Sequence, residues 1–343
     1  LKNCSMDHYK VVGKIGEGAH GLVLRGQHLD TGQEVALKKV LLKRLEDGIP
    51  NTVIREIKAL QEVDCEYVVQ LLDVFPQGLG FVFVFEFMPS GLWEMLRDAE
   101  NPLTIPQIKT YMIMLLKGVA YLHEHSIMHR FLQQDLKPAN LLISKEGVLK
   151  IADLGLGRMF WEEHNRPYSH QVATRWYRAP ELLYGARYYT EAVDLWAVGC
   201  ILGELLTNSP LFPGETDIEQ LAIVLKTLGT PTTETWPGLT ELPDYNKITF
   251  PETRGVGWDQ IFPDCSPEAI DLTKKFLLYN SDKRIKAKQA LVHPYFFTPP
   301  LPCQLSNMPK PTDGHRQQFK SKEYDTEKPV QELFSDLRKM LSS

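Results

Sequence analysis

The sequence lacks any apolar run long enough to cross a lipid bilayer. Its longest run, residues 81–88, is interrupted by Glu86 and is far shorter than the roughly 20 residues that a membrane-spanning helix needs. No secretory signal sequence is visible. We therefore expect that a membrane is not a partner of this protein.

Cysteine is scarce and irregularly spaced. The five cysteines, an odd number, lie at positions 4, 65, 200, 265 and 303 without any C-x-x-C pair. This spacing argues against a disulfide framework and against a zinc site. It favours reduced thiols and a location in the nucleus or the cytoplasm.

Positive charge is not in excess. The 343 residues include 38 Lys and Arg against 43 Asp and Glu, which gives a formal net charge of −5. Nucleic acid is not an expected partner, because its phosphates require a clustered basic surface that this sequence lacks. The hydrophobic content of 43% allows a sizeable core, and the length indicates two lobes and a tail.

One stretch places carboxylates, an amide and a lysine around a short hairpin. The segments D-L-K-P-A-N at 135–140 and D-L-G at 153–155 enclose two apolar runs joined by a glycine-containing turn. A hairpin brings its ends together, so Asp135, Asn140 and Asp153 should converge. Such oxygen ligands suit Mg²⁺ and phosphate oxygens.

These side chains match the parts needed for phosphoryl transfer. Asp135 would accept the proton of an attacking hydroxyl, and Lys137 would neutralise charge on the transferred group. Asn140 and Asp153 would hold the metal. A polar surface turn with solvated charges is the alternative for this motif taken alone.

A glycine-rich stretch near the start of the chain is compatible with two kinds of nucleotide-binding fold, and the residues that follow it distinguish between them. Gly16, Gly18 and Gly21 fit G-x-G-x-x-G, but the dinucleotide-binding version of this motif must open a helix. Here residues 22–24 continue as a strand, and a further strand carries Lys38. We therefore predict a hairpin lying over phosphates, with a flexible turn as the alternative.

A first helix is expected over residues 50–63, where apolar residues recur near helical spacing. It carries Glu56, a candidate ion-pair partner that would orient Lys38 towards phosphates. The buried strand at 81–85 leads into an extended segment, residues 86–88, whose backbone groups would face an adenine ring.

The remainder of the chain is predicted to be helical. A capping box at Thr104 and Gln107 begins a long core helix. Further helices are expected at 191–206, 217–228, 267–278 and 286–292. The pattern predicts an α+β fold with an N-terminal extension, a β-rich N-lobe, a helical C-lobe and a tail, over residues 1–8, 9–87, 88–297 and 298–343.

The ordered set of motifs resembles the eukaryotic protein kinase fold over residues 9–297. The motifs that carry the resemblance lie at 16–23, 35–38, 56, 129–130, 135–140, 153–155, 179–181 and 282–285. Within this fold, P-N-T-V-I-R-E at 50–56 and W-Y-R-A-P-E at 176–181 resemble the cyclin-dependent kinase family.

The resemblance implies an ATP- and Mg²⁺-dependent protein serine/threonine kinase. It would transfer the γ-phosphate to Ser or Thr followed by proline, in cell-cycle or ciliary signalling. The implied partners are protein substrates, a cyclin at the helix 50–63 and an activating kinase. The implied locations are the nucleus and the cytoplasm, with the cilium as a further one.

The resemblance also assigns roles by position. The catalytic residues would be Asp135, Lys137, Lys38 and Glu56, with Asn140 and Asp153 as metal ligands. The ATP-binding residues would be Ile15, Gly16, Glu17, Gly18, Ala19, His20, Gly21, Val23, Ala36, Lys38, Phe85, Glu86, Met88, Asn140, Leu142 and Asp153. Ser169 would be the activating phosphorylation site, with its phosphate bound by Arg55, Arg130 and Arg158. Arg284 would be the buried partner of Glu181.

The sequence departs from the family pattern at several positions. Residues 131–134 separate Arg130 from Asp135, and this insert supports an alternative function as a catalytically impaired pseudokinase or scaffold. Leu154 replaces the usual phenylalanine, which should preserve packing. Gly91 replaces an aspartate that bonds the ribose, which should weaken ATP binding without abolishing it.

The glycine loop also lacks a regulatory feature of the family. Ala19 and His20 stand where cyclin-dependent kinases often carry an inhibitory Thr-Tyr pair. We predict that this chain is not inhibited by phosphorylation at these two positions.

Overall fold

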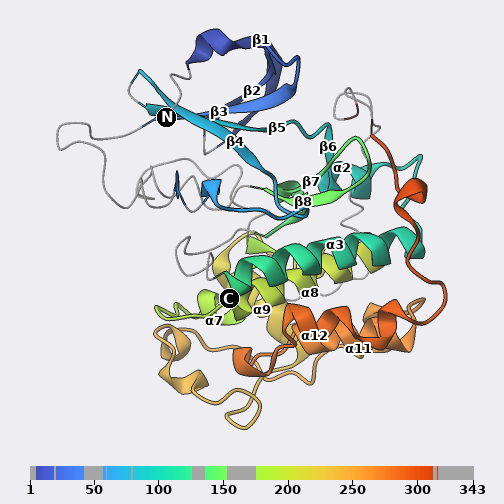
Figure 1. Cartoon of the computed structure of the whole chain (residues 1–343). Helices are drawn as coiled ribbons and strands as arrows, with labels where there is room; N and C mark the ends of the chain where they lie inside the picture. Colours follow the sequence, from blue (N-terminus) through green and yellow to red (C-terminus); the bar gives the residue numbers. More distant parts are fainter. Residues whose placement is uncertain are drawn as a thin grey trace.

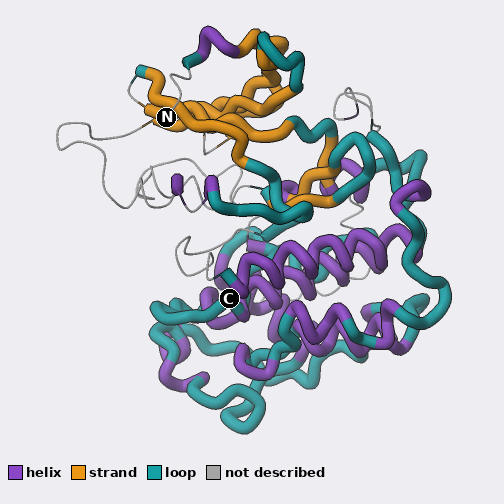
Figure 2. The backbone as a smooth tube through the Cα atoms, in the orientation of Figure 1, coloured by secondary structure: helices purple, strands orange, loops and turns teal. Residues whose placement is uncertain are grey.

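The computed structural model describes residues 5–18, 21–41, 57–58, 60–78, 80–125, 136–152, 175–311 and 315. These residues form a small lobe built mainly of strands and a larger lobe built mainly of helices (Figures 1 and 2). The prediction of an α+β fold with a β-rich first lobe and a helical second lobe is therefore confirmed.

The N-lobe is a five-stranded antiparallel sheet with the order β1-β2-β3-β5-β4. The strands are β1 (Tyr9–Gly18), β2 (Gly21–His28), β3 (Glu34–Leu41), β4 (Leu71–Gln77) and β5 (Gly80–Glu86). Successive side chains of a strand point to opposite faces, so Val35 and Leu37 enter a hydrophobic cluster while Ala36 and Lys38 point to the other face. Lys38 is paired with Val23 of β2 and Phe83 of β5.

Strand β4 is absent from the sequence-based prediction. It contains Pro76, which cannot donate a backbone hydrogen bond and weakens the strand signal. The structure places β4 at the edge of the sheet, paired with β5 alone. An edge position tolerates the missing donor because one side of the strand has no neighbouring strand to bond.

A second, three-stranded sheet lies where the lobes meet. After β5 the chain passes through residues 87–89, which we call the hinge, into β6 (Ser90–Gly91) and the short helix α2 (Leu92–Arg97). β6 pairs with β7 (Leu141–Ile143), and β7 pairs with β8 (Leu149–Ile151). This sheet forms the upper surface of the C-lobe, facing the N-lobe.

The C-lobe is organised around α3 (Ile105–Glu124) and α8 (Ala192–Thr207), which lie side by side below the small sheet (Figure 1). The backbone N–H of Thr104 donates to Gln107 Oε1 at 2.9 Å, as the predicted capping box requires. The other helices are α7 (Pro180–Leu183), α9 (Asp217–Leu228), α10 (Trp258–Ile261), α11 (Pro267–Phe276) and α12 (Ala287–Leu291). Short 3₁₀ helices span Met6–His8, Pro138–Asn140, Leu239–Glu241, Tyr245–Lys247, Ser281–Lys283, Pro294–Phe296 and Leu305–Asn307.

The bounds predicted at 191–206, 217–228, 267–278 and 286–292 agree with α8, α9, α11 and α12 to within two residues. The largest difference is at α11, which ends at Phe276, whereas the prediction extends to 278. Most of the predicted helix 50–63 lies outside the described residues. No helix in the part of the chain that the structure describes is both long and apolar enough to span a membrane.

Residues 298–311 lie along α3, beyond the predicted end of the kinase-like region. Lys109 Nζ donates to the Thr298 carbonyl at 2.7 Å, and the Cys303 N–H donates to Thr110 Oγ1 at 2.9 Å. Met308 is only 3% exposed. The orange-to-red trace in Figure 1 follows this segment from α12 up towards α2. The polar composition of the tail gave no sign of this packing.

Candidate functional site

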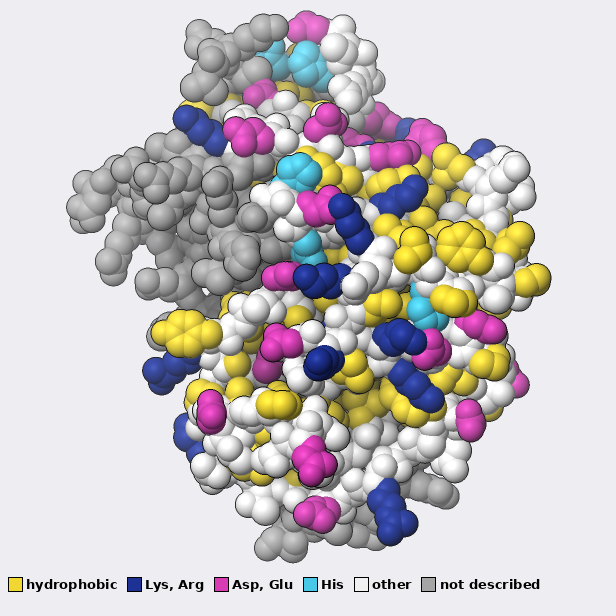
Figure 3. Space-filling view, turned by 60° about the horizontal axis from the view of Figure 1, so that its bottom comes forward, with side chains coloured by type: hydrophobic (Ala, Val, Ile, Leu, Met, Phe, Trp, Pro, Cys, Tyr) yellow, Lys and Arg dark blue, Asp and Glu magenta, His cyan; other side chains and the backbone are white. Residues whose placement is uncertain are grey.

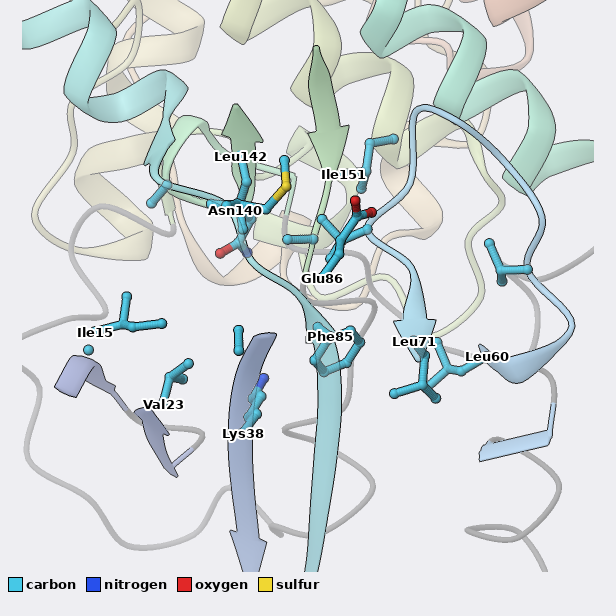
Figure 4. Close-up of a pocket in the computed structure, with 17 residues that line it drawn as sticks. Ile15, Val23, Lys38, Leu60, Leu71, Phe85, Glu86, Asn140, Leu142 and Ile151 are labelled. Carbon is cyan, nitrogen blue, oxygen red and sulfur yellow. The ribbon is translucent and has the colours of Figure 1, made fainter. Parts of the chain in front are cut away.

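A cavity of about 230 Å³ lies between the two lobes. Figure 4 shows the side chains that surround it. They come from the N-lobe strands β1 to β5, from residues 60–69 and the hinge, and from residues 139–142 and 151–152 of the C-lobe. In Figure 4 the strands β1 to β3 lie at the bottom and the C-lobe residues at the top. The lining residues are Ile15, Gly16, Val23, Ala36, Lys38, Leu60, Val63, Val69, Leu71, Phe85, Glu86, Met88, Ala139, Asn140, Leu142, Ile151 and Ala152.

The cavity is apolar over most of its surface. Val23 and Ala36 cover it from the N-lobe sheet, and Leu142 and Ile151 cover it from the small sheet of the C-lobe. Two facing apolar surfaces can hold a flat aromatic ring and exclude water from both of its sides. This region of the cavity therefore suits a nucleobase.

Polar groups lie on both sides of the cavity. Lys38 projects from β3 and is 9% exposed, and its nitrogen points into the space between the lobes in Figure 4. Asn140 lies on the opposite side, at the end of a 3₁₀ turn. A buried ammonium group and an amide facing one cavity can bind the oxygens of a phosphate chain.

The predicted hairpin is present and closes at the cavity. Leu141 pairs with Ile151 and Ile143 pairs with Leu149, and the turn between the strands contains Gly147 with φ +89°. Beyond the last strand pair, the Ala152 N–H donates to the Asn140 carbonyl at 2.8 Å. The two ends of the hairpin therefore meet at the cavity, as the sequence indicates.

The side chain of Glu86 does not point at the ring-binding space. Its carboxylate accepts hydrogen bonds from Lys150 Nζ at 2.8 Å to each oxygen, and from the Gln70 N–H at 2.8 Å. In Figure 4 the two oxygens lie near Ile151, away from Lys38. Any contact of Glu86 with a nucleobase would therefore be made by its backbone.

One described residue of the predicted site does not line the cavity. Lys137 is not among the lining residues, although its carbonyl accepts the Asn140 N–H at 2.9 Å. The backbone of Glu17, Gly18 and Gly21 belongs to β1 and β2, and their assigned part in ATP binding stays a prediction.

Other predicted residues lie outside the part of the chain that the structure describes. They are Ala19, His20, Arg55, Glu56, Arg130, Asp135, Asp153, Leu154, Arg158 and Ser169, together with the insert 131–134. Their assigned roles stay predictions. Among the described residues, no group of three or more His, Cys, Asp or Glu side chains is arranged to hold a metal ion.

Sequence reasoning missed the inner wall of the cavity. This wall consists of Leu60, Val63, Val69, Leu71 and Ile151, with Ala139 and Ala152 beside it. All are small or apolar, so nothing marked them as different from ordinary core residues. The one available signal was the i, i+3 spacing of Leu60 and Val63 in the predicted helix, which places both on one face.

Gly91 is tightly surrounded, although it has no side chain. A Cβ added there would lie 2.8 Å from Glu94 Oε2 and 3.1 Å from the Leu141 carbonyl oxygen. The carboxylate of Glu94, one turn along α2, therefore occupies the space next to Gly91. A side chain at position 91 would force Glu94 to move.

A buried ion pair fixes Glu181, near the start of α7, against the rest of the C-lobe. Arg284 Nη1 and Nη2 donate to the two carboxylate oxygens of Glu181 at 2.6 and 2.7 Å. The prediction that Arg284 is the buried partner of Glu181 is confirmed. Arg175 and Arg178 bind Asp217 at the start of α9, which holds the residues before α7 against the same lobe.

Comparison with known proteins gives a consistent result. The sequence profile of the protein kinase domain matches residues 9–296. The chain is 62% identical over 336 residues to cyclin-dependent kinase 20 of Danio rerio, with 96% of each chain covered. It is 62% identical to the Mus musculus protein of that name and 61% identical to the Homo sapiens one, each over 307 residues that cover 89% of this chain and 88% of the relative.

Proposed function

The chain belongs to the protein kinase family and is a serine/threonine kinase of the cyclin-dependent type, and we propose that the cavity between its lobes binds ATP. The observation that carries this proposal is the arrangement of one cavity with an apolar sandwich, the buried Lys38 and, on the other side, Asn140. The adenine would lie between Ala36 and Leu142, with its edge along the hinge.

The residues present fit a triphosphate and its metal. Lys38 would bind phosphate oxygens, and the amide oxygen of Asn140 is the kind of hard ligand that Mg²⁺ accepts. Asp153 would add a carboxylate as second ligand. Bound Mg²⁺ would neutralise charge that develops on the phosphates.

The roles of the protein groups follow from the family pattern. Asp135 would accept the proton of the substrate hydroxyl, and Lys137 would stabilise charge on the transferred group. The Lys38–Glu56 ion pair would fix the lysine towards the phosphates. Catalysis then consists of positioning and charge neutralisation, with little covalent chemistry asked of the protein.

We also propose the regulation that the family pattern implies. The substrates would be proteins with proline after the target Ser or Thr, and a cyclin would bind the helix 50–63. An activating kinase would phosphorylate Ser169, whose phosphate would pair with Arg55, Arg130 and Arg158. The protein would act in the nucleus, the cytoplasm and the cilium, in cell-cycle or ciliary signalling.

A phosphate-transfer assay tests the proposed activity. Radiolabelled ATP would be supplied with a Ser-Pro peptide and with a matched Ser-Ala peptide. We expect transfer to the Ser-Pro peptide that is lost in Asp135→Asn and in Lys38→Met. Equal signals from the wild type and Asp135→Asn would show that the label does not come from this site.

The insert 131–134 supplies the test of the alternative function. A chain that binds ATP but transfers no more phosphate than Asp135→Asn would be a scaffold. Deleting residues 131–134 would then restore transfer if the insert displaces Asp135. If the deletion leaves a measurable rate unchanged, the insert does not impair the enzyme.

A further inference from the structure

Two ion pairs connect the N-lobe with the C-lobe. The inner pair joins Glu86, at the end of β5, to Lys150 on β8. The outer pair joins Glu34, at the start of β3, to Lys145 in the turn between β7 and β8. We call the two pairs together the hinge clamp. None of the phosphate-transfer roles described above uses either lysine.

The inner pair is held in place by several short contacts. Lys150 Nζ lies 2.8 Å from both oxygens of Glu86, and the side chains are 16% and 23% exposed. Gln70 fixes the same residue twice, since its N–H donates to Glu86 Oε1 at 2.8 Å and its carbonyl accepts the Glu86 N–H at 3.2 Å. These contacts connect β8 to Glu86, the residue immediately before the hinge.

The outer pair reaches the hinge through an arginine. Glu34 also pairs with Arg25 of β2, whose Nε donates to it at 2.9 Å. The guanidinium of Arg25 lies 4.6 Å from the centre of the Phe87 ring. Lys145, Glu34 and Arg25 therefore form a continuous chain of contacts from the C-lobe turn to the middle of the hinge.

The turn that carries Lys145 is itself held from behind. Gly147 has φ +89°, and a Cβ there would lie 2.8 Å from the Pro309 carbonyl oxygen and 2.9 Å from Met308 Cβ. The buried segment 298–311 thus packs directly against this turn. Lys145 consequently extends towards the N-lobe from a fixed base.

The same hairpin forms the floor of the nucleotide cavity. Lys150 is directly paired with Leu142, and directly paired residues of antiparallel strands project to the same face. Leu142 lines the cavity from below, while Glu86 and Ala36 line it from above. A change in the clamp would therefore alter the spacing between the two apolar surfaces.

We infer that Lys145 and Lys150 are positioning residues for nucleotide binding, because the hinge clamp sets the distance between the roof and the floor of the cavity. This inference rests on the proposed binding of ATP in that cavity. The lysines touch no reacting atom, so they should act on the affinity for nucleotide and leave the transfer step unaltered.

Methionine substitutions test the clamp, because methionine keeps the length of the lysine stem without its charge. We compare Lys145→Met, Lys150→Met and the double variant with Lys247→Met, which breaks a 2.7 Å ion pair to Asp244 inside the C-lobe. Each clamp variant should raise the KM for ATP about two- to fivefold, the range expected for one partly exposed ion pair. The kcat should stay within about twofold in every variant, and Lys247→Met should match the wild type in both constants.

Salt and a charge-conserving variant distinguish the clamp from a simple loss of packing. The wild-type KM should rise with salt, while that of the double variant should change much less, because its ion pairs are already absent. Lys145→Arg keeps the positive charge opposite Glu34 and leaves the Glu34–Arg25 pair intact, so it should retain most of the affinity that Lys145→Met loses. A fall in kcat with unchanged KM, or a KM for Lys145→Arg as high as that of Lys145→Met, would overturn the inference.

Hydrogen exchange tests the hinge clamp without relying on phosphate transfer or on ATP binding. In nucleotide-free protein, the amides of Gln70 and Glu86 should exchange faster in Lys150→Met than in Lys247→Met. If the wild type shows no phosphate transfer, the proposed function fails, while the exchange rates still decide whether the clamp fixes the hinge. Identical exchange in these two variants would overturn the clamp.

Discussion

Breaking the buried Glu181–Arg284 pair should destabilise the C-lobe more than any surface substitution. The Arg284 side chain is fully buried and that of Glu181 is 10% exposed. Arg284 also donates to the Ala192 carbonyl at 2.9 Å and to the Leu278 carbonyl at 2.8 Å. Arg284→Met would leave a buried carboxylate and two carbonyl groups without these donors.

The size of the effect follows from the burial. Removing one partner of a buried ion pair costs about 3–5 kcal/mol, and the lost carbonyl contacts place Arg284→Met at the upper end of that range. Total unfolding free energies are only about 5–15 kcal/mol, so the variant should be close to unfolding. Arg178→Met is the control: its pair with Asp217 is 34% and 51% exposed and should contribute less than about 1 kcal/mol.

Urea unfolding followed by tryptophan fluorescence measures this directly. The Arg284 guanidinium lies 5.1 Å from the centre of the Trp196 ring, so the signal includes a reporter at the site. The double variant Glu181→Leu with Arg284→Met removes the unpaired carboxylate and should be more stable than Arg284→Met by about 1–3 kcal/mol. Strictly additive single effects, or a loss in Arg284→Met no larger than in Arg178→Met, would refute this reasoning.

Three further predictions concern the surroundings of the site and the tail. Gly91→Asp should not strengthen ATP binding, measured by titration with a fluorescent nucleotide, unless Glu94→Ala removes the carboxylate that lies 2.8 Å from the new Cβ. Burial raises the pKa of Asp98, but hydrogen bonds from Asn101 and from backbone N–H groups outweigh it and hold the pKa below its ordinary value of 3.8. The carboxylate therefore stabilises the fold above about pH 4, and this contribution is lost as the pH falls through the folded pKa. In Asp98→Asn, the free energy of unfolding should consequently fall less steeply as the pH is lowered below about 4. Met308→Ala should cost about 2 kcal/mol or more in urea unfolding, because this side chain is 3% exposed; no loss would show that the tail packing adds nothing to stability.

Local signals account for the parts of the fold that were predictable. The helix α9 has the predicted bounds 217–228 because Thr216 accepts the Glu219 N–H at its start and Gly229, with φ +93°, ends it. The β7–β8 hairpin was predictable because a glycine turn joins two apolar runs. In both cases the residues that define the element lie within or next to it in the sequence.

Contacts between distant residues were not predictable by the same means. Glu86 and Lys150 are 64 positions apart, and nothing in either neighbourhood indicates that they meet. Composition also misled the interpretation of residues 298–311, because proline and polar residues there hide a few buried side chains. The partnership of Glu181 with Arg284, 103 positions apart, was expected only through the family resemblance.

The cavity illustrates why pattern and geometry supply different information. The motifs indicated the chemistry, since a lysine, an amide and glycines in a fixed order are typical of phosphate transfer. They did not indicate that Glu86 would face Lys150, away from the ring-binding space. That orientation adds to the backbone role expected of Glu86 a role for its side chain, which ties the hinge to β8. A chemical motif can thus be read from residue types, whereas the support that holds it requires the packed structure.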